Sequence, residues 1–282
     1  MKQIYLIPNI ITAFGLSCGL FVVFKVNLFV PGAGAYELLY SSALLLLLAA
    51  FADLLDGAIA RIIRAESEFG VMFDSLADTI SFGVAPSVLF LKSLSLEHAS
   101  GLSFFAVVGA MLYTICGVLR LVRFNVKAQE AKSDAIALIA HKKNFTGLPI
   151  PAAAAGAVSV NLFLSSHFFN EWFVEMPHLV KTIVLTCIMI VLGYLMISKW
   201  KFPSLKTLHV RVPSFHLIFF TVLVAMFVLY GIFYYLPIIL LVGSVGYILT
   251  GCILTIIRLI AGKKSKTLVD FEPDDQDDKE DS

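Results

Sequence analysis

The stretch DLLDGAIARIIRAESEFGVMFDSLAD, residues 53–78, places four aspartates between strongly apolar flanks. They are Asp53, Asp56, Asp74 and Asp78, and a short polar turn separates the two pairs. Ionisable side chains within membrane helices are costly and mark a functional site by default. The alternative is that all four lie exposed to water at a helix end, and their spacing argues against it.

The spacing puts each pair on one face of a helix. Asp53 and Asp56 are three residues apart, and Asp74 and Asp78 are four apart. The short turn makes the two helices antiparallel, and the midpoints of the inner and the outer pair both fall in that turn. Asp56 should therefore lie opposite Asp74, with Asp53 opposite Asp78 about one helical turn deeper. The pattern predicts one cluster of four carboxylates.

The rest of the chain is typical of a membrane protein. Its 282 residues are 59% hydrophobic and only 15% charged, and the mean hydropathy is +0.90. A bilayer needs about 20 mostly apolar residues for each helical span. Composition therefore predicts an all-α polytopic membrane protein with eight transmembrane helices. These are centred near Phe14, Leu46, Phe82, Ala110, Val158, Met189, Val224 and Ile248.

Basic residues indicate the orientation in the membrane. If both termini are cytoplasmic, 18 of the 21 Lys and Arg residues lie on the cytoplasmic side, which agrees with the positive-inside rule. Only Lys25, Lys92 and Lys181 then lie outside. We expect a transmembrane domain over residues 1–266 and an acidic, disordered cytoplasmic tail over residues 267–282.

Four carboxylates in a partly dry pocket repel one another unless cations hold them. Two divalent ions would balance the charge, and an all-oxygen ligand set favours hard cations such as Mg²⁺ or Mn²⁺. Two such ions form the usual clamp for displacement at phosphorus. The alternative use of acids in a membrane, a cation or metabolite transporter, explains the carboxylates but not their surroundings.

Those surroundings fit a phosphate-containing substrate. Gly57, Ala60 and Gly70 leave room beside the acids, and Arg61 can meet phosphate oxygens as a forked donor. The arginine lies at the cytoplasmic end of its helix. Together these residues predict a pyrophosphate-containing substrate that is approached from the cytoplasm and has a lipid at its other end. Nothing points to a nucleic acid partner.

The whole stretch fits D-x2-D-G-x2-A-R-x8-G-x3-D-x3-D at every fixed position. This pattern resembles the signature of the CDP-alcohol phosphatidyltransferase family. Further segments, IPNIIT near the N-terminus, SFGVAPS (81–87), LRLVRFNV (119–126) and FTGLPIPAAA (145–154), look like the bacterial phosphatidylserine synthases of that family. The resemblance covers about residues 4–160.

The resemblance implies transfer of a phosphatidyl group from CDP-diacylglycerol to L-serine, in a homodimer of the bacterial inner membrane. It implies roles for residues matched position by position. Metal ligands are Asp53, Asp56 and Asp74, and Asp78 is the general base, with a possible metal contact. Residues around the CDP moiety are Gly57, Ala60, Arg61 and Gly70, with Asn9 and Thr12 holding the nucleotide.

Serine carries a carboxylate, so a cation should lie near the site. The candidates are Arg120 and Arg123 with the adjacent Asn125, and Lys142 with Lys143. The alternative for these basic residues is that they anchor the chain to lipid headgroups. Glycerol phosphate, inositol or choline as the acceptor, or a different lipid tail, stay open as alternatives. The Gly147-Leu148-Pro149 segment suggests a fixed turn over the site.

Overall fold

The computed structural model describes residues 6–28, 35–63, 67–94, 101–130, 144–172, 176–203 and 235–261, with isolated residues between 223 and 234. Helices dominate these ranges, which confirms the all-α fold class; two strands of three residues are the exception within them. The elements are α1 (Leu6–Leu28), α2 (Ala35–Ile62), α3 (Glu68–Asp78), the π-helix η1 (Thr79–Val84), α4 (Ala85–Ser93), α5 (Gly101–Glu130), β1 (Asn144–Thr146), α7 (Ile150–Leu164), α8 (His167–Trp172), α9 (His178–Ile197), β2 (Lys201–Pro203) and α11 (Leu236–Ala261).

Several helices are long and apolar enough to cross a bilayer. Among the described residues, five single helices meet both conditions, namely α1, α2, α5, α9 and α11. Helix α7 is apolar but shorter. In addition, α3, η1 and α4 follow one another without a break from Glu68 to Ser93. The chain is therefore an integral membrane protein. The expected count of eight spans stays a prediction, because most residues around Val224 lie outside the described ranges, as does the acidic tail.

Helix α1 buries small residues and exposes large ones. On α1, Gly15 and Gly19 face the interior, whereas Phe21 and Phe24 are 58% and 61% exposed. Soluble proteins bury their large apolar side chains, and membrane helices pack through small residues while the large ones meet lipid. The distribution independently supports the membrane assignment.

Close contacts hold α1 against the acid-bearing helices. A Cβ at Gly15 would lie 3.4 Å from the Cβ of Ala52 on α2, and a Cβ at Gly19 would lie 2.7 Å from the Cα of Ser81 on η1. The Ser81 hydroxyl also donates to the Gly15 carbonyl at 3.4 Å. The GLSCG segment thus lets α1 approach both neighbours closely.

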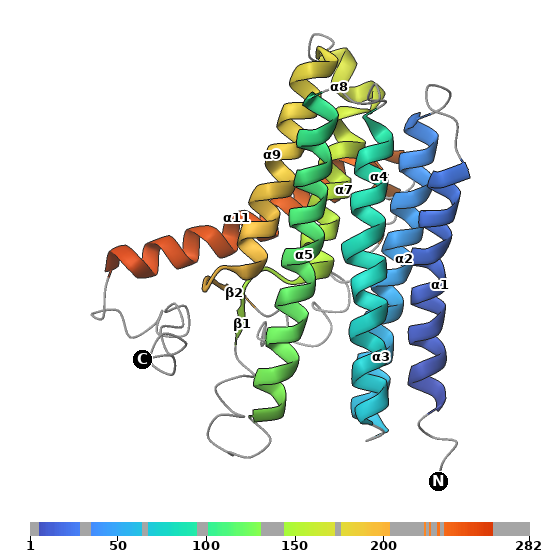
Figure 1. The fold of residues 1–282 in the computed structure, drawn as a ribbon, viewed down its shortest axis with the longest axis vertical. Coiled ribbons are helices and arrows are strands. Elements are labelled where there is room, and N and C mark those ends of the chain that lie inside the picture. The colour runs from blue at the N-terminus through green and yellow to red at the C-terminus, as the bar shows by residue number, and fades with distance from the viewer. Residues whose placement is uncertain are drawn as a thin grey trace.

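Most helices run along one direction, as Figure 1 shows for α1, α2, α4, α5 and α9. Helix α1 packs along α2, α5 packs along α9, and α7 packs against both α9 and α11. Helix α11 crosses the bundle at a steep angle (Figure 1). The acids of α2 and α3 lie on the side of the bundle that α1 covers.

A two-stranded antiparallel sheet joins the segment before α7 to the segment after α9. Strand β1 pairs antiparallel with β2, with Phe145 opposite Phe202. Directly after β1, the Gly147 N–H donates to the Trp200 carbonyl at 2.8 Å. Gly147 has φ of +80°, and a Cβ there would collide with the Met196 carbonyl oxygen. The glycine therefore sits in a fixed turn, as its sequence suggested, while the position of this turn over the site stays a prediction.

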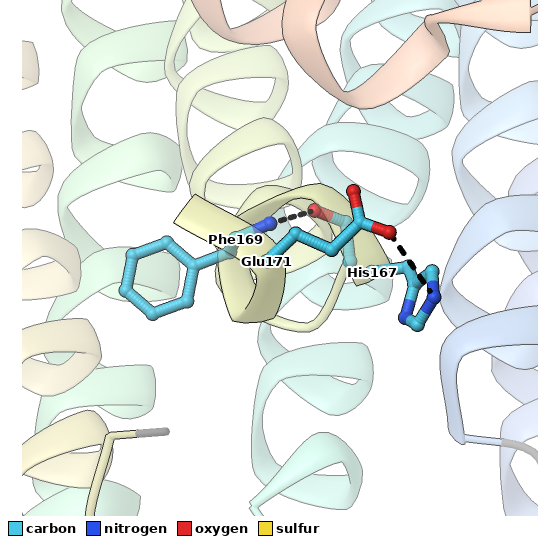
Figure 2. Close-up of polar contacts among 4 residues, drawn as sticks. His167, Phe169 and Glu171 are labelled. Atoms are coloured by element: carbon cyan, nitrogen blue, oxygen red, sulfur yellow. Dashed lines mark hydrogen bonds and ion pairs between the residues drawn. The ribbon is translucent and has the colours of Figure 1, made fainter. Parts of the chain in front are cut away.

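Helix α8 lies at the opposite end of the bundle from the start of α3 (Figure 1). Figure 2 shows its exposed ion pair, with His167 Nε2 and Glu171 Oε1 3.5 Å apart, one helical turn from each other. Phe169 between them is buried. Such an exposed pair contributes little to stability.

Candidate active site

The helix that carries Asp74 and Asp78 begins at a side-chain cap. Ser67 has extended backbone dihedrals, and its hydroxyl accepts a hydrogen bond from the Gly70 N–H at 3.0 Å. This is the usual role of a serine at the N-cap, where it satisfies a backbone donor of the first turn. The cap starts α3 where the short turn from α2 requires it.

Three of the four predicted acids come together directly. Asp53, Asp56 and Asp74 each bring one carboxylate oxygen within 4.8 Å of the others. Asp56 is buried, whereas Asp53 and Asp74 are partly buried. Asp78 lies one turn beyond Asp74 and lines a small cavity together with the other three. The structure thus assembles the acids from α2 and α3 on facing sides, as their spacing predicts.

A hydroxyl from α1 orients one of these acids. Thr12 Oγ1 donates to Asp56 Oδ2 at 2.5 Å, and both side chains are buried. A hydrogen bond to a carboxylate is short and strong because the acceptor is charged. Thr12, expected from the resemblance to hold the nucleotide, therefore also fixes the rotamer of Asp56.

The residues expected around the CDP moiety line one cavity of about 160 Å³ next to the acids. All six of them contribute to it, together with Asp56 and Asp74. The complete lining is Pro8, Asn9, Thr12, Asp56, Gly57, Ala60, Arg61, Ser67, Gly70, Val71 and Asp74. The smaller acid-lined cavity shares Thr12, Asp56 and Asp74 with it. Pro8, Ser67 and Val71 were not predicted from the sequence.

The two glycines of the cavity are close to polar side chains. A Cβ at Gly57 would lie 3.9 Å from an Arg61 guanidinium nitrogen, so this arginine folds back over the glycine. A Cβ at Gly70 would lie 3.1 Å from both Asn9 Oδ1 and Ser67 Oγ. Asn9 on α1 therefore lies close to Gly70 on α3, and a larger side chain at either glycine would reduce the space.

Arg120 on α5 lies beside the acids. Its guanidinium interacts electrostatically with the Asp78 carboxylate and with Tyr247 on α11. Its Nε atom is buried and has no hydrogen-bond partner among the described residues. A buried donor of this kind needs an acceptor. Tyr247 was missed by the sequence reasoning, since nothing near it in the chain points to α5.

The other candidates for a serine carboxylate lie differently. Arg123 extends toward α9, where its guanidinium donates to the Ile197 carbonyl at 3.4 Å. The Asn125 amide donates to the Ser75 hydroxyl at 2.8 Å and so joins α5 to the acid-bearing helix. The structure thus brings Arg120 and Asn125 to α3 and separates Arg123 from them. Lys142 and Lys143 lie outside the described residues.

The clustered negative charge of the three carboxylates favours binding of a cation. Three carboxylates within 4.8 Å of one another repel strongly in a partly buried setting, and the oxygens that they offer suit a hard divalent ion. The donor set therefore fits the metal that the sequence predicts. With a cavity lined by Arg61 alongside, the arrangement can bind a pyrophosphate and stabilise charge at phosphorus.

Several known proteins are related to this chain in sequence. The family model for CDP-alcohol phosphatidyltransferase matches residues 5–256. A CDP-diacylglycerol–serine O-phosphatidyltransferase of Helicobacter pylori is 30% identical over 218 residues, which cover 77% of this chain and 80% of that protein. One from Bacillus subtilis is 32% identical over 200 residues, covering 71% and 91%. An archaetidylserine synthase of Methanothermobacter thermautotrophicus is 36% identical over 167 residues, covering 58% and 59%.

The family model spans the whole described bundle up to α11, including the acids, the cavity and the fixed turn. The resemblance stated from the sequence is confirmed: the chain belongs to the CDP-alcohol phosphatidyltransferase family.

Proposed function

We propose that this chain transfers the phosphatidyl group of CDP-diacylglycerol to the hydroxyl of L-serine, giving phosphatidylserine and CMP. The single observation that carries the proposal is the cavity in which residues of α1, α2 and α3 surround the acids. The names of the bacterial relatives support serine as the acceptor. Arg120 beside Asp78 supports it too, because serine brings a carboxylate that needs a cation.

The four acids provide the ligands for the metal. Asp53, Asp56 and Asp74 would hold a first Mg²⁺ or Mn²⁺, and Asp78, which lines the same small cavity, would complete a second position. Divalent ions bound there supply positive charge to the pyrophosphate oxygens and to the departing CMP. The chain's own Arg61 adds a forked donor on the cytoplasmic side of the cavity.

The reaction is a direct displacement. The serine hydroxyl oxygen attacks the phosphorus of the phosphatidyl group, a new P–O bond forms, and the P–O bond to CMP breaks. Asp78 accepts the hydroxyl proton, and CMP leaves with the electron pair. A serine hydroxyl is a poor nucleophile near neutral pH, so its position beside a base is essential. The Arg120 guanidinium holds the serine carboxylate and thereby fixes the distance between hydroxyl and phosphorus.

The proposal includes a place in the cell. The bacterial relatives and the distribution of basic residues support the inner membrane, with the acids near its cytoplasmic face. A soluble acceptor and soluble CMP would then enter and leave from the cytoplasm. Homodimer formation stays a prediction from the resemblance.

The test is an acceptor series. Protein purified into lipid nanodiscs receives CDP-diacylglycerol and, in separate reactions, L-serine, glycerol 3-phosphate, inositol or choline. We expect CMP release with L-serine in Mg²⁺ or Mn²⁺, and none after removal of divalent ions with EDTA. Release with another acceptor in place of serine would refute the serine assignment, and metal-independent release would refute the role of the acids.

The base role of Asp78 has its own prediction. Asp78→Asn keeps the size of the side chain but removes the proton acceptor, so we expect CDP-diacylglycerol to bind within a few-fold of wild type while turnover falls by about 10²–10⁴-fold. Binding is measured with a radiolabelled CDP-lipid and turnover by CMP release. An equal loss of binding and turnover would refute the base role and leave Asp78 only its contact with the metal.

The archaetidylserine synthase relative favours a second candidate that differs only in the lipid. An ether-linked CDP-lipid would fill the same cavity through its identical head. Running the L-serine reaction with CDP-archaeol as the donor in place of CDP-diacylglycerol separates the two, since we expect faster CMP release from CDP-diacylglycerol.

A further inference from the structure

The helix that carries Asp74 and Asp78 changes its winding immediately after the second acid. From Glu68 to Asp78 it is α-helical, and from Thr79 to Val84 it is a π-helix. At its end the Ala85 N–H bonds to the Ile80 carbonyl, five residues back instead of four. Wide turns of this kind are rare and occur frequently at functional sites.

Pro86 accounts for the wide turn. Proline has no N–H, and its ring clashes with the carbonyl four residues earlier in an α-helix. In this chain that carbonyl belongs to Phe82, so regular winding would both crowd it and leave it without its helical donor. The π-helix moves the backbone away from this clash.

Tyr113 on α5 satisfies the carbonyl that Pro86 leaves without its helical donor. Its hydroxyl donates to the Phe82 carbonyl at 2.9 Å, and the side chain is fully buried. The neighbouring Gly83 carbonyl accepts a hydrogen bond from the Ser87 hydroxyl at 3.0 Å. Without such donors, a carbonyl in the membrane interior would remain unsatisfied at considerable cost.

The wide turn determines where the acids point. A π turn adds one residue to the helix, which rotates the segment before it by about 100° relative to uninterrupted α-helical winding. The segment after it is held in the bundle, where Ala85, Leu89 and Phe90 are buried. With regular winding, therefore, Asp74 and Asp78 would face away from Asp53 and Asp56 on α2.

We propose that Tyr113 is a positioning residue: by holding the Phe82 carbonyl it maintains the π turn and thereby aims Asp74 and Asp78 at the acids of α2. The proposal concerns the metal-binding acids and the base of the proposed function. Only its turnover measurement rests on that function; the Mn²⁺ affinity and stability measurements do not. Tyr113 is not among the residues that line either acid-lined cavity, and it acts through the backbone of η1.

The experiment compares Tyr113→Phe, Pro86→Ala and the double variant with wild type. Mn²⁺ affinity is measured by electron paramagnetic resonance, turnover by CMP release, and stability by thermal unfolding. We expect Tyr113→Phe to weaken Mn²⁺ binding and slow turnover by about 10- to 100-fold each. Pro86→Ala supplies a new N–H for Phe82 and favours regular winding, so it should lower both quantities as well.

The double variant gives the sharpest result. If Pro86 and Tyr113 act through the same turn, the double variant should be no worse than the worse single variant. Multiplied losses would mean that the two residues act independently and would overturn the proposal. If Tyr113→Phe does not fold, Pro86→Ala alone decides, since unchanged Mn²⁺ affinity in that variant contradicts a role for the turn.

Ser159→Ala is the matched control. Ser159 is fully buried and its hydroxyl lies 2.7 Å from that of Ser244 on α11, away from the acids. We expect it to lower the unfolding temperature about as much as Tyr113→Phe while leaving Mn²⁺ affinity and turnover within about twofold. If Tyr113→Phe behaves in the same way, the tyrosine is only structural. Failure of the serine assay leaves the Mn²⁺ measurements intact, so the two proposals fail separately.

Discussion

Charged side chains at the two ends of the bundle are arranged in opposite ways. At α8, His167 and Glu171 are neighbours on one short helix, are mostly exposed, and pair with each other. Between α2 and α3, like charges from different helices converge in a partly buried cavity. The first arrangement follows from local spacing and costs nothing. The second costs free energy that a bound cation or protonation offsets, which is why the acids carry the proposed metal site.

The largest expected effect tests this contrast directly. Asp56→Asn removes a buried metal ligand, so we expect turnover to fall by about 10³-fold or more, equivalent to about 4 kcal/mol of transition-state stabilisation. Without added metal, the same change should raise the unfolding temperature, because it removes repulsion among the acids. Glu171→Gln on α8 is the control and should change stability by less than about 0.5 kcal/mol with turnover unchanged. If Asp56→Asn and Glu171→Gln changed turnover and stability equally, the proposed difference between the two groups of charged residues would be wrong.

An intermediate effect is expected at Arg120, where a cation meets the acid cluster. Arg120→Lys keeps the charge but loses the planar fork, so we expect the KM for L-serine to rise by about 10-fold or more with a smaller change in kcat. L-serine amide, which lacks the carboxylate, should show no such rise. Arg123→Lys is the matched control on the same helix. A rise in the KM for CDP-diacylglycerol instead would place Arg120 at the nucleotide.

The smallest effect is expected at Thr12, which lines the cavity and donates a hydrogen bond to Asp56. Thr12→Val keeps the shape and removes the hydrogen bond to Asp56 Oδ2, so Mn²⁺ affinity should fall by about 10-fold. Excess Mn²⁺ should restore most of the turnover. Thr12→Ser, which retains the hydroxyl, should stay near wild type. Loss of turnover that metal does not restore would assign Thr12 to substrate instead.

The acid cluster could be predicted because all four acids lie within one short stretch of sequence, residues 53–78. Two pairs of acids with helical spacing on either side of a short turn can meet in only one way, and the structure brings Asp53, Asp56 and Asp74 together accordingly. The cavity residues of the motif follow for the same reason. The integral membrane character follows from composition alone.

What the sequence did not reveal depends on contacts between distant segments. Strands β1 and β2 pair with each other, although α7, α8 and α9 separate them in the chain. Strands of three residues also carry no periodic signal. Tyr247 meets Arg120 only because α11 crosses the bundle. Pro86 was a local signal for irregular winding, but its donor, Tyr113, lies on another helix.

The contact between Gly19 and Ser81 has a mechanical consequence. Where two backbones meet with no space for a methyl group, neither can slide, but both can tilt about the point of contact. Asn9 lies ten residues along α1 from this pivot, a lever arm of about 15 Å. A tilt of α1 about this contact would change the distance between Asn9 and Gly70, and it would also move Thr12, which donates to Asp56 from the same helix. The width of the cavity and the position of that acid are therefore mechanically coupled.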